Sequence, residues 1–68
     1  MAAIKTIKER TTGEVRIAGT LYQVRDELQR HEYSGDVSWI IVKGISNGTG
    51  HQVTTYKTRK AALAAWEA

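Results

Sequence analysis

The chain has 68 residues, of which 41% are hydrophobic and 25% charged, with a formal net charge of +3 and no cysteine. That length leaves room for a single domain spanning residues 1–68, and the composition excludes a disordered chain, a disulfide scaffold and a thiolate metal site. No apolar run reaches the roughly 20 residues of a membrane helix, and no signal region opens the chain, so we expect a cytoplasmic protein without a membrane role.

Residues 4–10 and 14–18 predict a β-hairpin at the start of the chain. The first run is rich in strand-compatible side chains, and the second alternates between apolar and charged ones, as a half-buried strand does. A turn signal, Thr-Thr-Gly at residues 11–13, separates them. A three-residue loop there places Lys8 opposite Arg16, although a slip of one residue would exchange the two faces.

Residues 21–32 predict an α-helix. Thr20 fits the N-cap position, where a hydroxyl accepts a hydrogen bond from a free backbone N–H group. Leu21, Val24 and Leu28 follow at helical spacing, and polar or charged side chains fill the other side. The helix is expected to end before the Ser-Gly-Asp loop that follows it.

Residues 37–45 and 51–57 predict a second hairpin, joined by the glycine-rich loop 46–50. The first of these strands is apolar at both even and odd positions, which is typical of a central strand. Thr58 then fits the N-cap of a second helix over residues 59–67.

These elements predict an α+β two-layer sandwich in the order β-β-α-β-β-α. We expect a four-stranded, mainly antiparallel sheet with both helices on one face and the other face bare.

Alternation along the second hairpin predicts which side chains occupy the bare face. Even-numbered residues are expected to face the helices, which leaves the opposite set outward, joined by Lys8 and Arg16. Aromatic rings among cations suit single-stranded nucleic acid, because bases stack on the ring while cations neutralise phosphates. Two alternatives stay open: the ring lies under the helices with the faces exchanged, or a second copy covers the outward apolar side chains. The outward set is Trp39, Ile41, Lys43, Val53, Thr55 and Lys57.

A second basic group lies at the start of the predicted C-terminal helix. Lys57, Arg59 and Lys60 stand where cations oppose the helix dipole, at a cost of about 0.3–1 kcal/mol each. Contact with an anion would account for them. The alternative is that they are solvated surface residues whose cost the cap at Thr58 offsets.

The remaining motifs do not predict catalysis, a metal or a cofactor. The glycine loop leads into a strand, whereas a phosphate-binding P-loop leads into a helix. His31 and His51 lack the local spacing of zinc ligands. No serine has the context of a nucleophile, so we expect a protein that is not an enzyme and takes no small-molecule substrate.

The segment Tyr56-Lys57-Thr58-Arg59-Lys60-Ala61-Ala62, with the hairpin before it, resembles the hairpin-then-helix ending of the small DNA-binding domains at the front of phage-type integrases. In size and in its expected core order, the chain also looks like small phage anti-defence proteins such as anti-CRISPRs. The first resemblance implies DNA contact and the second implies inhibition of a host protein complex.

The sequence therefore predicts a non-catalytic protein that contacts nucleic acid or a nucleoprotein complex through a basic surface. The alternative is a small phage-type inhibitor, anti-CRISPR or otherwise anti-defence-like, that binds a host protein complex. A homodimer is a third expectation, because a domain this small without disulfides often needs a second subunit for stability.

Overall fold

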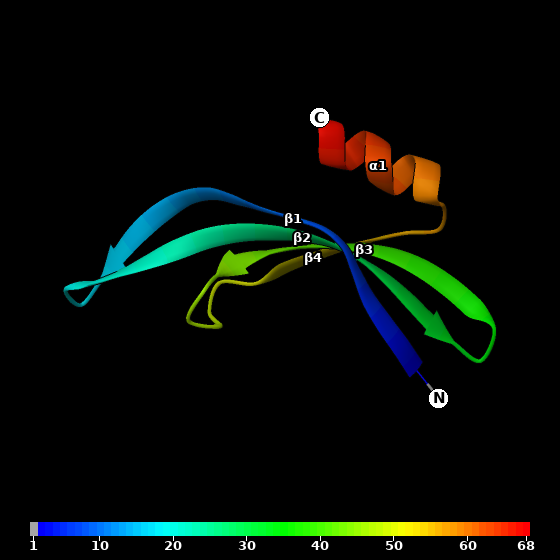
Figure 1. Ribbon diagram of the computed structural model, residues 1–68, viewed down its shortest axis with the longest axis horizontal. Helices are drawn as coiled ribbons and strands as arrows, with labels where there is room; N and C mark the ends of the chain where they lie inside the picture. Colours follow the sequence, from blue (N-terminus) through cyan, green and yellow to red (C-terminus); the bar gives the residue numbers. More distant parts are fainter. Residues whose placement is uncertain (1) are drawn as a thin grey trace.

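The computed structural model describes residues 2–68 as a four-stranded antiparallel sheet with one C-terminal helix (Figure 1). Neighbouring strands in the sheet follow one another along the chain. The elements are β1 (Ala2–Ile17), β2 (Thr20–Tyr33), β3 (Asp36–Ile45), β4 (Gln52–Tyr56) and α1 (Arg59–Glu67). The predicted β-β-α-β-β-α sandwich with two helices is therefore wrong, since the described residues contain a single helix.

β2 lies where a helix was predicted over residues 21–32, because its backbone pairs on both edges. It is hydrogen-bonded to β1 on one side and to β3 on the other. Asp26 and Leu28 are buried whereas their immediate neighbours are more exposed, which is the period of a strand. Leu21, part of the expected apolar helix stripe, is 53% exposed. Sheet pairing thus overrides the helix propensity of the Glu, Gln, Leu and Arg residues in this segment.

Two tight turns connect the three longest strands. Ala18 and Gly19 have φ values of 48° and 84°, and Ser34 and Gly35 have values of 50° and 84°. Positive φ at both central residues is what a two-residue type I′ hairpin requires. Gly19, which directly precedes the N-cap of the predicted helix, instead reverses the chain between two strands.

β1 is one continuous strand and not the hairpin that was predicted. Its register with β2 shifts at Ile7 and at Thr12, where one extra residue bulges from the strand. The bulge at Ile7 lets this side chain pack against the core. The bulge at Thr12 lies within the Thr-Thr-Gly segment that was predicted to be a turn. Lys8 and Arg16 consequently both pair with β2 and not with each other.

β3 and β4 form the second predicted hairpin, but its register differs by one residue from the prediction. Trp39 pairs with Tyr56, and Ile41 with Thr54. Directly paired residues point to the same side of a sheet, and Ile41 belongs to the core under α1. The predicted outward set is therefore split: Trp39, Ile41 and Lys43 face the helix, whereas Val53 and Thr55 face away from it.

α1 forms over the predicted residues and closes a small core on one side of the sheet. The Oγ1 of Thr58 accepts a hydrogen bond from the Ala61 N–H group at 3.1 Å, as expected of an N-cap. The buried apolar residues are Leu28, Ile41, Ala62 and Trp66, with Ile7, Trp39, Tyr56, Leu63 and Ala65 packed around them.

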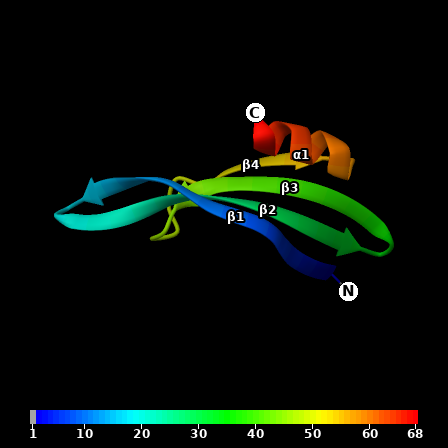
Figure 2. The same cartoon turned by 45° about the horizontal axis from the view of Figure 1, so that its top comes forward.

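The molecule is thin and elongated, with principal extents of 44 × 29 × 15 Å. Figure 2 shows α1 above one side of the sheet only. We call the side that carries α1 the helix side and the opposite side the far face. The described residues place no second layer over the far face.

Candidate nucleic-acid interface

Charge is distributed unequally between the two sides of the sheet. Residues paired in register share a side, so the pairing assigns each charged strand residue. The helix side, counted together with α1 and the residues 57–58 that lead into it, holds eight of the ten Lys and Arg residues and three of the seven Asp and Glu residues, a net charge of +5. The far face holds the other two Lys and Arg residues and the other four Asp and Glu residues, a net charge of −2. The cations of the helix side are Lys5, Lys8, Arg10, Arg30, Lys43, Lys57, Arg59 and Lys60.

A cationic and aromatic row crosses all four strands on the helix side. Lys5 pairs with Arg30, Arg30 with Trp39, and Trp39 with Tyr56. The Arg30 guanidinium lies 6.0 Å from the centre of the Trp39 ring and is 3.0 Å from the Glu32 carboxylate. Both rings pack against the core. The exposed end of the row is therefore cationic, and its aromatic end supports the helix.

The row leads directly into the basic residues at the start of α1. Tyr56 precedes Lys57, and Thr58 caps the helix in which Arg59 and Lys60 form the first turn. All three cations are exposed, and the first turn contains no acidic residue. Within residues 2–68 none of the three has a carboxylate in ion-pair range. We call Lys57, Arg59 and Lys60 the basic cluster.

The other predicted site residues lie away from this cluster. Lys8 reaches Glu67 at the opposite end of α1, at 3.9 Å. Lys43 is four residues from Trp39 along β3, about 13 Å at roughly 3.3 Å per residue. Arg16 lies near the far end of the first hairpin, where its guanidinium donates to the Gly19 carbonyl at 3.3 Å. The structure thus brings together Trp39 and the basic cluster, and separates Lys8, Lys43 and Arg16 from them.

Two cations of the row, Lys5 and Arg30, were missed from the sequence. The helix predicted over residues 21–32 puts Arg30 on its polar side, where it has no relation to Trp39. Only the alternation of Asp26, Leu28 and Arg30 along a strand brings it to the helix side. Lys5 depends on the bulge at Ile7, which no local pattern indicated.

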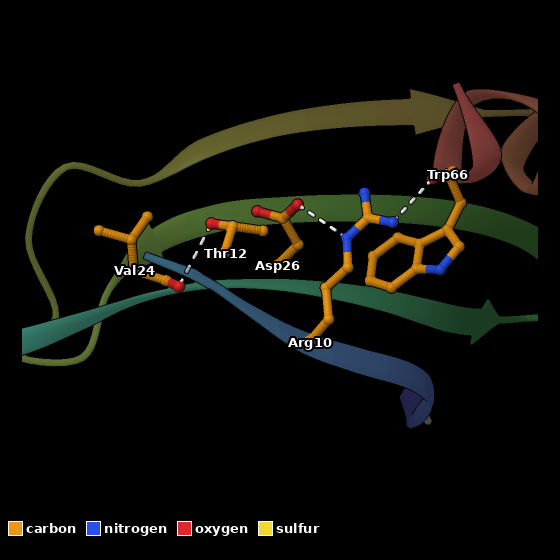
Figure 3. Close-up of polar contacts among 5 residues, drawn as sticks. All are labelled: Arg10, Thr12, Val24, Asp26 and Trp66. Carbon is orange, nitrogen blue, oxygen red and sulfur yellow. Dashed lines mark hydrogen bonds and ion pairs between the residues drawn. The ribbon is translucent and has the colours of Figure 1, made fainter. Parts of the chain in front are cut away.

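Arg10 forms a separate polar network that fixes the C-terminal end of α1 to the sheet (Figure 3). Its Nε donates to the Asp26 carboxylate at 3.2 Å, and a terminal N–H group donates to the Trp66 carbonyl at 3.0 Å. Its guanidinium lies 4.0 Å from the centre of the Trp66 ring. Asp26 is 5% exposed, so this pair satisfies a buried carboxylate. Figure 3 also shows Thr12, whose hydroxyl donates to the Val24 carbonyl at 3.3 Å.

Two shallow hollows lie on either side of the sheet around Gly44. The hollow on the far face, about 290 Å³, includes Arg25, Glu27 and His51. The hollow on the helix side, about 370 Å³, includes Asp26 and Lys43. Over residues 2–68 no three His, Asp or Glu side chains gather as metal ligands would. The far-face hollow also includes Ser46, whose hydroxyl accepts a hydrogen bond from the Gln23 N–H group at 3.1 Å. Within the described residues Ser46 makes no hydrogen bond to His51, so the basic surface is the stronger candidate site.

Residues 2–68 contain no helix that is long and apolar enough to cross a membrane. No protein-family model matches the sequence, and searches of curated proteins and of solved structures found no match.

Proposed function

We propose that this chain is a non-catalytic protein that binds the phosphate backbone of nucleic acid through its helix side. The observation that carries the proposal is the separation of charge, with a net +5 on the helix side and −2 on the far face. A one-sided positive surface concentrates phosphate and releases condensed counterions when it binds.

The basic cluster provides the strongest part of this surface. Lys57, Arg59 and Lys60 lack carboxylate partners in the described chain, and so does Lys5 at the opposite, β1 end of the row. Unpaired cations bind phosphate without first breaking an ion pair. Arg59 and Lys60 also oppose the helix dipole, a cost that phosphate contact offsets.

Packing of the aromatic rings favours contact with a duplex over stacking on single-stranded bases. Trp39 and Tyr56 lie beside the basic cluster, but both pack against the core. Base stacking needs an open ring face, whereas duplex binding without sequence readout needs only positioned cations. Binding is therefore expected to be largely independent of sequence.

Two arginines provide a matched test of this surface. Arg59 on the helix side and Arg16 on the far face are both exposed and both lack an ion pair in the described chain. We expect Arg59→Gln to weaken binding to a labelled DNA duplex and to reduce the slope of log K against log salt by about 1, measured by fluorescence anisotropy. Arg16→Gln is expected to leave the slope unchanged.

Folding does not confound this comparison, because Arg59→Gln removes a cation that opposes the helix dipole and is not expected to destabilise α1. Equal slopes for the two variants, or affinity that does not change with salt, would contradict the proposal. An RNA duplex in the same assay shows whether the surface distinguishes A-form from B-form backbones.

A further inference from the structure

The far face is a sheet surface with an apolar centre and no covering layer in the described chain. Ile40 and Val42 of β3 lie at its middle, beside Val53 of β4. Val53 is 60% exposed, and Ile4 of β1, on the same face, is 64% exposed. Apolar side chains of this kind gathered on one face are typical of a protein interface.

The total accessible surface indicates how much area a partner would cover. The chain exposes 4912 Å² at a mass of 7.6 kDa. A compact monomer of that mass exposes about 4,300 Å², so the excess is about 600 Å². A standard interface buries about 800 Å² on each partner. The excess thus approaches the area that one stable interface removes from each copy.

The small core indicates that this surface matters for folding. Only four apolar residues of the described chain are buried, and two of them belong to α1. The chain has no cysteine to form a disulfide. A domain of this size with so small a core generally depends on a subunit contact or another staple.

The sheet edges are poor sites for that contact. β1 is a long edge strand, but bulges at Ile7 and Thr12 interrupt its pairing pattern. β4, the other edge, has five residues. Bulges and short strands are the features by which proteins prevent edge-to-edge association. The far face is therefore the surface left for a partner.

We propose that a second copy of the chain covers the far face, giving a two-fold dimer with the sheets packed face to face. Packed sheets lie about 10 Å apart, and self-complementary two-fold contacts are the commonest form of assembly. This arrangement puts the two basic helix sides outermost, so that they repel least. Stacking a helix side on a far face would instead bury the basic cluster.

The far face also presents a hydrogen-bonding pair to a second copy. Glu27 and His31 lie two residues to either side of Gln29 on β2. A two-fold axis that crosses the strands at Gln29 sets Glu27 of one copy against His31 of the other. Arg25 is already paired with Glu9 within one chain, at 3.2 Å. Glu27 thus meets a hydrogen-bond donor and Glu9 is offset by Arg25, which reduces the repulsion between two acidic faces.

Adjacent residues on opposite sides of β4 provide a matched pair of variants. Val53 lies on the far face and Thr54 on the helix side, and both are exposed. We expect Val53→Lys to weaken dimerisation by at least about thirtyfold in sedimentation equilibrium, because each copy then carries a charge into the interface. Thr54→Lys, which adds the same charge on the other side, is expected to keep the dimer.

Three outcomes overturn the proposal: a wild-type chain that is monomeric at every concentration, a Val53→Lys variant that remains dimeric, or dissociation of both variants alike. No nucleic acid enters this measurement, so its result is independent of the function proposed above.

A second measurement avoids any new charge. Because the chain has no cysteine, Val53→Cys and Thr54→Cys each introduce a single thiol. We expect maleimide to label the thiol at 53 more slowly than the thiol at 54 at high protein concentration, and the two rates to converge on dilution. Equal rates at high concentration would place the interface elsewhere.

Discussion

Among single residues, Arg10 makes the most varied set of contacts. It joins β1 to the buried Asp26 carboxylate on β2, donates to the Trp66 carbonyl near the end of α1, and covers the Trp66 ring. One side chain thus satisfies a buried charge and an unpaired helix carbonyl. The helix depends on this contact because its own nine residues are too few to be stable alone.

Removal of this arginine is expected to be destabilising. Arg10→Leu leaves Asp26 buried without its ion-pair partner, which we expect to lower the free energy of unfolding by about 2–4 kcal/mol. The double variant Arg10→Leu/Asp26→Leu is expected to recover a large part of that loss, because no buried charge remains. Urea unfolding, monitored by tryptophan fluorescence, measures the stability of both variants. No recovery of stability in the double variant would contradict this account.

The basic cluster shows which site residues a sequence can predict. Lys57, Arg59 and Lys60 lie within four residues, so they are neighbours in any fold that starts a helix at Thr58. Their role in binding stays a prediction. Two positions were left open for Trp39, on the bare face as a stacking platform or under the helices with the faces exchanged, and in the structure it packs under α1. Its side of the sheet depends on the pairing partner, Tyr56, which no local pattern specifies.

Among the elements, β2 shows how pairing overrides propensity. Its sequence is rich in good helix formers and carries an apolar helical spacing at Leu21, Val24 and Leu28. As a strand it satisfies its backbone groups through two neighbours and buries Leu28 completely. The turn dipeptides Ala18-Gly19 and Ser34-Gly35 were the local signals that favoured strands on either side.

The first of these turns contains a strained residue. Ala18 adopts a φ of 48°, which costs an L-residue with a Cβ about 1–2 kcal/mol. We expect Ala18→Asn to raise the free energy of unfolding by about 0.5–1 kcal/mol, because asparagine tolerates this region and favours type I′ turns. Ala18→Val is the control and should destabilise. Thermal unfolding measures both, and a less stable Ala18→Asn variant would contradict the turn assignment.

α1 was predicted correctly because its determinants are local. Thr58 accepts the Ala61 N–H group three residues on, and the helix runs over residues 59–67 as expected. A cap and the helix that it starts involve contacts within a few residues.

Taken as a whole, the molecule is a thin sheet with a basic helix side and an apolar-centred far face. Both proposals follow from this asymmetry: phosphate contact on one side and a second copy on the other. If both hold, the dimer presents two basic surfaces that point in opposite directions.

Such a dimer has a thermodynamic signature. We expect the Tm to rise with protein concentration, because unfolding is then coupled to dissociation. The Val53→Lys variant should unfold at a lower Tm that does not depend on concentration. Differential scanning calorimetry over a range of concentrations measures this, and a wild-type Tm that does not change would contradict an obligate dimer.

The sequence by itself determined what depends on composition and on neighbouring residues: the absence of disulfides, the second hairpin, the capped C-terminal helix and the basic cluster at its start. The tertiary structure decided that β2 is a strand and not a helix, where β1 bulges, and on which side of the sheet Trp39 lies. The physical reason is that a strand's pairing and register depend on residues distant in the chain, and a shift of one residue moves every side chain to the other face.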